Sequence, residues 1–107
     1  MAWTYGGDPA ANSRDNVRFL LGDTDTNDQL VSDAEVAFAI ADTDSMHGAA
    51  AQLAEHLSAK YARYPDEKTG QQEEKSSQRA DAFAALAKRL RASITTGANA
   101  SLVFEVL

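Results

Sequence analysis

The sequence predicts an all-α protein: a small four-helix domain followed by an extended C-terminal tail. Apolar residues recur at helical spacing in four stretches, and a residue that favours a helix start precedes each of them. Hydrophobic residues make up 44% of the 107 residues, and many of them are alanine, so the core must consist of closely packed helices. This length suits one domain with a modest core. We expect residues 1–94 to form the helical domain and residues 95–107 to form a flexible spacer and an apolar tail.

The first helix is predicted over residues 13–22. Ser13 is a suitable N-cap, and Asp15 lies near the positive end of the helix. Gly22 is expected to end the helix, because glycine readily adopts the left-handed conformation that follows a C-cap. The apolar residues with i, i+3, i+4 spacing form the expected buried face: Val17, Leu20 and Leu21.

The second helix is predicted over residues 32–42. Ser32 and Glu35 have the spacing of a capping box, in which each side chain accepts a hydrogen bond from the backbone of the other. The helix is expected to fade at residues 42–44. Its predicted buried face contains Val36, Ala39 and Ile40.

The third helix is predicted over residues 45–64, starting at Ser45 and stopping before Pro65. Small residues beside its apolar stripe should let a neighbouring helix approach closely. The stripe consists of Ala50, Leu53, Leu57 and Tyr61.

The fourth helix is predicted over residues 76–94, after a connection at 65–75 that has no apolar side chain. We expect this connection to be exposed, and the helix to end at Thr95–Gly97. The predicted buried face contains Phe83, Leu86, Ala87, Leu90 and Ile94.

The last six residues are unusual for the end of a small helical domain, because they are almost entirely apolar. They are β-prone and carry one charge, on Glu105. An apolar strand of this kind is an aggregation hazard in a monomer, so it packs either against its own domain or against another chain. We favour another chain, as a strand added to an exposed sheet edge. The residues concerned are Leu102, Val103, Phe104, Val106 and Leu107.

The acidic charge is unevenly distributed. The net charge is −6, with −8 in residues 1–58 and +2 in residues 59–107. An acidic chain is a poor candidate for binding nucleic acid, because neutralising phosphates supplies most non-specific affinity. The acidity mainly indicates a well-solvated surface, although it would also suit a wall past which DNA slides.

No constellation of residues predicts catalysis, a cofactor or a metal. The acidic loop that starts at Asp23 has oxygen ligands at the first, third and fifth positions of a calcium loop. However, Asp28 replaces the required glycine, and Ala34 replaces the bidentate glutamate. We therefore expect these side chains to bond to nearby backbone amides. His47 and His56 are nine residues apart and fall on opposite faces of the third helix, so they should not share a metal.

Two further groups of residues have alternative interpretations. Trp3 and Tyr5 either fold back onto the helices or act as interface anchors, a role in which both residue types are enriched. A basic patch near the end of the fourth helix either complements the negative helix end or contacts a partner, which we expect to be a protein. This patch contains Lys88, Arg89 and Arg91.

The most specific pattern lies in residues 3–35. It contains Trp-x-Tyr, then Gly-Asp-Pro, then Val-Arg-Phe-Leu-Leu-Gly-Asp-Thr-Asp, and finally Ser-Asp-Ala-Glu. This pattern resembles the N-terminal region of the head-tail connector (adaptor) proteins of long-tailed bacteriophages and related gene-transfer particles. The resemblance is close over residues 3–41, loose to about residue 92, and absent from the last fifteen residues. The matching positions are Trp3, Tyr5, Asp8, Pro9, Asp15, Arg18, Phe19, Leu20, Gly22, Asp23, Asp25, Leu30, Ser32, Asp33 and Glu35.

The resemblance implies a structural, non-enzymatic virion protein. Family members form homo-oligomeric rings, commonly of twelve copies, between the portal protein and a stopper or tail-completion protein. DNA passes through the lumen without specific binding, and no membrane is involved. The implied location is the head-tail interface of the virion, and the host cytoplasm before assembly. Most matching positions are expected to determine the fold. The contacts that family members make through an extended apolar stretch between the last two helices are not expected here, because residues 69–75 are polar.

Two other classes of function remain open from the sequence. One is a small DNA-binding packaging or regulatory protein in which the first two helices form a helix-turn-helix. The acidic gap from Asp23 to Val31 is long for that motif, and Asp33 and Glu35 would repel phosphate. The other is an accessory or antitoxin-like partner of an enzyme.

Overall fold

The computed structural model describes the backbone of residues 2–63 and 76–106, and the side chains of these ranges as far as Ile94. Four helices are present: α1 (Ser13–Leu21), α2 (Asp33–Thr43), α3 (Met46–Ala62) and α4 (Ser76–Val106). The described residues include no strand. The predicted all-α class and the four helices are therefore confirmed.

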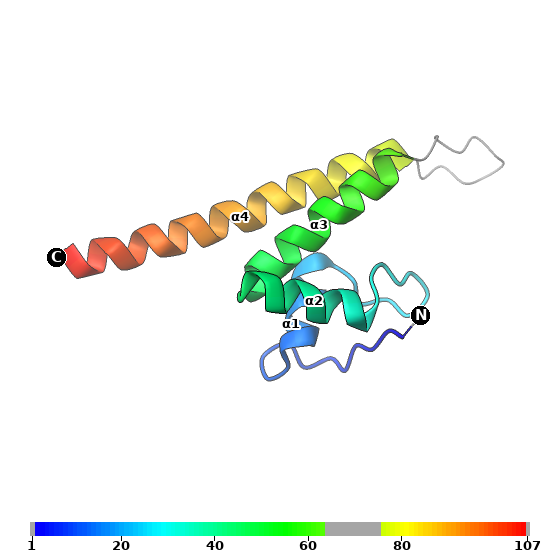
Figure 1. The fold of residues 1–107 in the computed structure, drawn as a ribbon, viewed down its shortest axis with the longest axis horizontal. Helices are drawn as coiled ribbons and strands as arrows, with labels where there is room; N and C mark the ends of the chain where they lie inside the picture. The colour runs from blue at the N-terminus through cyan, green and yellow to red at the C-terminus, as the bar shows by residue number, and fades with distance from the viewer. Residues whose placement is uncertain (1, 64–75, 107) are drawn as a thin grey trace.

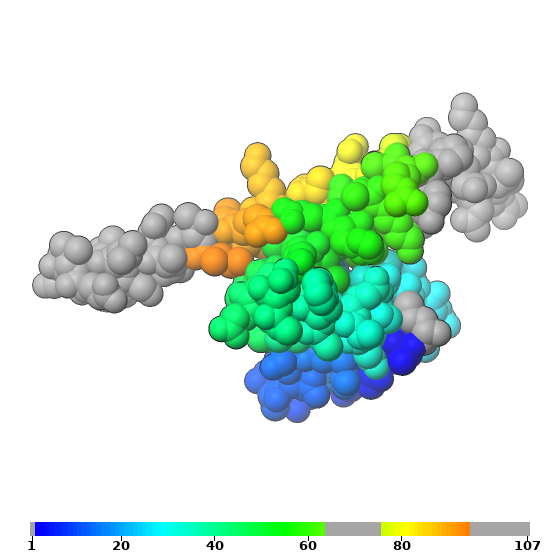
Figure 2. All heavy atoms as spheres, in the orientation of Figure 1, coloured from blue at the N-terminus to red at the C-terminus, as the bar shows by residue number. Residues whose placement is uncertain are grey.

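The third helix is the centre of the fold. α3 packs against each of the other three helices. Figure 1 shows α4 running antiparallel beside α3, while α1 and α2 lie on the opposite side of α3. The space-filling view shows the same division, with α1 and α2 together on one side and α4 along the other (Figure 2). Burial on both sides of α3 explains why its sequence is rich in alanine.

The core contains the faces that the helical spacing predicts. Leu57 is fully buried at the centre of α3, and a row of α3 alanines is buried as completely. These small side chains let the backbones of neighbouring helices approach closely, so much of the packing involves backbone and Cβ atoms. Ile94 was predicted to be buried but is 36% exposed, beyond the last buried residue of α4, Leu90. The buried apolar residues of the four faces include Val17, Leu21, Val36, Ala39, Ala50, Leu53, Leu57, Ala87 and Leu90.

Local side-chain chemistry sets most helix ends. Ser32 and Glu35 form the predicted capping box, and Ser45 accepts a hydrogen bond from Gly48 N as the N-cap of α3. Gly22 has a φ of 84°, as the predicted end of α1 requires. The predicted N-cap of α1 was wrong: Asn12 occupies that position and accepts from Asp15 N, whereas Ser13 is the first helical residue.

The C-terminal part differs from the prediction. The sequence predicted a helix end at Thr95–Gly97 and an extended tail at 102–107, but α4 continues to Val106. A single interior glycine costs a helix only about 1 kcal/mol relative to alanine, and no proline interrupts this stretch. Figure 1 shows that the last turns of α4 extend past the start of α3, with no other helix beside them. The side-chain contacts predicted for residues 102–107 lie outside the described side chains.

Candidate functional site

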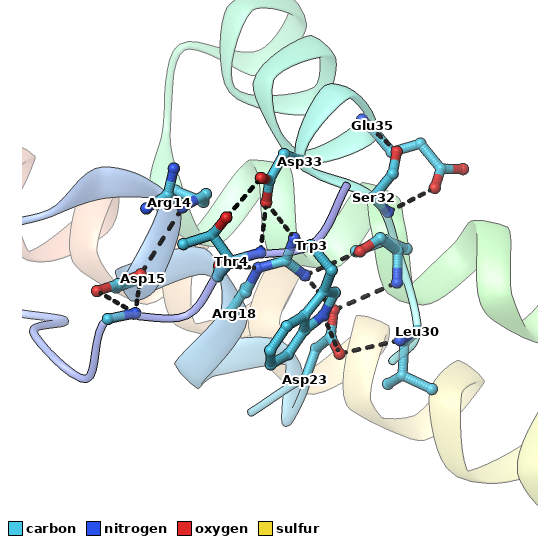
Figure 3. A network of polar contacts seen from close by, with 12 residues as sticks. Trp3, Thr4, Arg14, Asp15, Arg18, Asp23, Leu30, Ser32, Asp33 and Glu35 are labelled. Carbon is cyan, nitrogen blue, oxygen red and sulfur yellow. Dashed lines mark hydrogen bonds and ion pairs between the residues drawn. The ribbon is translucent and has the colours of Figure 1, made fainter. Parts of the chain in front are cut away.

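Arg18 is the centre of a buried polar network that unites the N-terminal segment with α1 and α2 (Figure 3). Its side chain is 0% exposed. Nη1 forms an ion pair with Asp23 and donates to the backbone oxygen of Val31 at 2.9 Å. Nη2 donates to Asp33 Oδ1 at 2.8 Å, and Nε donates to the backbone oxygen of Thr4 at 2.8 Å. One side chain therefore connects four separate parts of the chain.

Asp23 organises the acidic loop between α1 and α2. It is buried, and besides Arg18 it accepts hydrogen bonds from the backbone N–H groups of Leu30 and Val31 at 3.0 and 3.2 Å. Asp25 accepts from Asn27 N at 2.9 Å within the same loop. The expectation that these carboxylates bond to nearby backbone amides is confirmed.

Asp33, the first residue of α2, holds the start of the chain. Its carboxylate accepts from Thr4 N at 2.9 Å and from Thr4 Oγ1 at 2.8 Å, while its own backbone N–H donates to Ala2 O at 2.8 Å. Burial raises the pKa of Asp33, but the hydrogen bonds from Arg18 and Thr4 outweigh it and hold the pKa below the ordinary 3.8. The N-terminal segment is thus attached to α2 although it forms no regular secondary structure.

Asp15 holds the turn that precedes α1. Its buried carboxylate accepts from Gly6 N and from Asp8 N, each at 3.1 Å. The hydrogen bond from Gly6 is the largest of the effects that lower the pKa of Asp15 below 3.8. Next in the turn, Pro9 O accepts from Asn16 Nδ2 at 3.0 Å. The Gly-Asp-Pro part of the sequence pattern is therefore fixed by residues of α1.

Trp3 folds back onto this network, which favours one of its two interpretations. Its Nε1 donates to Asp23 Oδ1 at 3.0 Å, and the Arg18 guanidinium lies 4.9 Å from the centroid of its ring. Tyr5 is half-buried, so an interface role for Tyr5 stays a prediction.

Arg18 belongs to the sequence pattern, but its burial and its ion pairs were not predicted. A signal was present, because Arg18 lies beside Val17 and three residues before Leu21, on the apolar side of α1. A buried guanidinium requires carboxylate partners. Asp23 and Asp33 were available at short sequence distances, so all three could have been linked.

This network has the chemistry of a fold determinant. N–H donors occupy the carboxylates of Asp15, Asp23 and Asp33. The lowered pKa values of Asp15 and Asp33 keep these two groups in the charged form. A general acid or base needs a pKa near the working pH and a proton within reach of substrate. The lowered pKa values of Asp15 and Asp33 lie away from neutral pH, so these two carboxylates do not have the pKa that such a role needs.

An exposed apolar groove lies between α2 and α3, and we call it the α2–α3 groove. It encloses about 370 Å³ and has a mainly apolar surface. Phe38 is 65% exposed at this groove, although large apolar side chains are usually covered. His56 is also exposed there, with Nε2 3.7 Å from Glu35 Oε2, whereas His47 is half-buried. The lining includes Ala34, Glu35, Phe38, Ala39, Leu53 and His56.

The basic residues of α4 do not form one free patch. Arg91 makes a two-bond ion pair with Glu55 of α3, at 2.6 and 2.7 Å, which lowers the pKa of Glu55 and raises that of Arg91. Arg79 donates to Tyr61 Oη and to Asp28. Lys88 and Arg89 are exposed. The pairing of Arg91 was not predicted, and it shows one of the three residues of the predicted patch bound to α3.

Within the described residues, no three histidine or carboxylate side chains are grouped so that they could hold a metal ion. None of the described helices has the length and apolar character needed to cross a membrane. The sequence matches no protein-family model, and it has no significant match among curated proteins or solved structures.

Proposed function

We propose that this chain is a structural head-tail connector that forms a ring between the portal of a phage-like particle and the next connector or the tail. DNA passes through the lumen of this ring. The proposal originates in the sequence pattern of residues 3–35, and the arrangement of that pattern in the fold supports it.

The observation that carries the proposal is that the pattern acts as one unit. Trp3, Asp23 and Asp33 are far apart in sequence, yet all three contact Arg18. A pattern whose members hold one another in place is a stronger basis for resemblance than isolated matches, because loss of one member would destabilise the rest.

The surface outside the network suits contacts with other proteins. Phe38 on α2 is 65% exposed, and α4 extends beyond the rest of the molecule. Exposed aromatic side chains and an unpartnered helix end are features of assembly components. The acidic N-terminal half also fits a ring through which DNA moves without adhering.

Measurement of particle mass is the direct test. We expect native mass spectrometry of the chain with purified portal rings to show many copies per portal, with twelve as the number implied by the resemblance. Particles lacking this chain should fail to join heads to tails, and adding it should restore joining. A chain that stays monomeric with portal rings and does not restore joining would refute the proposal.

A DNA-binding measurement tests the main alternative function, a DNA-binding protein with a helix-turn-helix. A helix-turn-helix protein should retain duplex DNA on a filter at low salt, where phosphate contacts are strongest. We expect no retention, because Asp33 and Glu35 lie at the start of α2, where a recognition helix would meet the DNA. Retention that falls steeply with added salt would favour the regulator instead.

A further inference from the structure

The α2–α3 groove is an exposed apolar surface, and several observations restrict which kind of partner would fit it. The groove is open, its surface is mainly apolar, and it exposes Phe38. Its volume of about 370 Å³ falls within the range of about 300–1,000 Å³ typical of ligand pockets. A groove between two helices with these properties suits a short apolar segment of another protein.

The same chain contains a segment of matching chemistry. Five of the six residues at 102–107 are apolar. The backbone of α4 carries this segment away from the rest of the molecule, because the helix runs on for about 18 Å between Ile94 and Val106 at about 1.5 Å per residue. Figure 1 shows these turns extending away from α2 and α3. A helical α4 therefore keeps residues 102–106 out of the groove of its own chain.

We propose that the α2–α3 groove of one copy receives residues 102–107 of a second copy. This inference rests on the proposed function and identifies the contact that links neighbouring subunits. The contact joins two different surfaces, so each copy both offers a segment and accepts one. Repetition of such a heterologous contact generates a closed ring when the rotation between copies closes.

The absence of cysteine from the sequence permits a direct crosslinking test. Ala34→Cys places a thiol at the groove, and Leu107→Cys places one in the segment. Disulfides form only when the two Cα atoms come within about 7 Å. Mixing the two full-length variants under mild oxidation should give a covalent heterodimer on a non-reducing gel.

Ala59→Cys is the matched control, since Ala59 is an exposed alanine that lines a different groove, between α3 and α4. Its yield with Leu107→Cys should be much lower. An equal or higher yield at Ala59 would overturn the proposal. So would a disulfide within a single chain of the double variant Ala34→Cys/Leu107→Cys at high dilution, because the segment would then occupy its own groove.

Phe38 and Phe19 offer a second, independent comparison, because both are exposed phenylalanines on helices. Phe38→Ser should weaken self-association by about tenfold or more, as expected for an aromatic anchor. Phe19→Ser should change it little. Phe38→Ser should also have no further effect in a chain that ends at Ser101, because both changes remove the same contact.

The outcomes separate this inference from the proposed function. If Phe38→Ser and Phe19→Ser weaken association equally, or if the effects of Phe38→Ser and truncation add, the groove is not the receptor. If rings form on the portal and join heads to tails in the Phe38→Ser variant, this inference fails while the proposed function stands. Circular dichroism of each variant checks that the helices are intact.

Discussion

The N-terminal region and the α3–α4 pair are held together by different kinds of contact. In residues 2–33, charged side chains fix the irregular backbone. The buried carboxylates of Asp15 and Asp23 and the partly exposed carboxylate of Asp33 accept from backbone N–H groups, and Arg18 links the last two. Between α3 and α4, buried alanines and leucines form the contact, and the ion pair between Arg91 and Glu55 lies at its exposed edge.

This difference shows how a small chain can order a long stretch without regular secondary structure. Each buried carboxylate specifies particular partners, because an unpaired buried charge is very costly. Alanine contacts are less selective, since similar small side chains recur along both helices. The polar region thus defines one arrangement, while the helical pair supplies most of the apolar core.

The largest effect is expected from breaking the centre of the network. Arg18→Ala should destabilise the protein by about 3–5 kcal/mol, because it leaves the buried Asp23 carboxylate without its cation. Arg91→Ala is the matched control and should cost about 0–1 kcal/mol, because that pair is half exposed. Urea denaturation measures both. Equal losses would mean that the two regions are not held differently.

A core substitution in α3 tests the other side of the comparison. Leu57→Ala should cost about 2–5 kcal/mol, because Leu57 is fully buried and its truncation leaves a cavity. Gln52, on the same helix, is not a suitable surface control, because it is half-buried and donates to Asp42 at 3.0 Å. Gln78, which is exposed on α4, is the better control and should cost almost nothing. A small loss at Leu57 would contradict the assigned core.

Acid should act on the polar region. The pKa values of Asp15 and Asp33 are lowered in the folded protein, so their stabilisation is fully present above about pH 4 and is lost as pH falls through the lower folded values. Glu55 adds to the loss in the same direction. The urea midpoint should therefore fall between pH 5 and pH 3, and less so in Asp33→Asn. An unchanged midpoint would contradict these assignments.

A smaller effect should distinguish two adjacent residues. Asn12→Ala should cost about 1 kcal/mol, because Asn12 is the N-cap of α1, whereas Ser13→Ala should be nearly neutral. Thermal melts of the two variants measure the difference. A larger loss of stability in Ser13→Ala than in Asn12→Ala would support Ser13 as the N-cap, as the sequence predicted.

Predictions from the sequence succeeded where the deciding chemistry is local. The Ser32 capping box, the Ser45 cap and the left-handed Gly22 each depend on residues within one turn, and all three are confirmed. The cap of α1 depends on more distant residues. Asn12 N donates to Asp8 O at 3.0 Å, and Asp15 holds the same turn, so the preceding loop selects Asn12 over Ser13.

The candidate site was predicted only as a set of positions. Its connections to Arg18 span up to 15 residues, and helical periodicity contains no information on such pairs. The helical course of α4 beyond Ile94 was missed for another reason. Gly97 and the β-prone residues after it disfavour a helix only weakly, and such local preferences are easily overridden.

The carboxylates that hold the N-terminal segment have a consequence for amide hydrogen exchange. The N–H groups of Thr4, Gly6 and Asp8 lie outside any helix, yet each donates to Asp33 or Asp15. Amides in irregular segments usually exchange by fraying, at rates close to those of an unfolded chain. Here exchange requires the hydrogen bonds to Asp33 and Asp15 to open, so deuterium uptake at these three positions should be slower than in an unfolded segment and should report on the opening of those contacts.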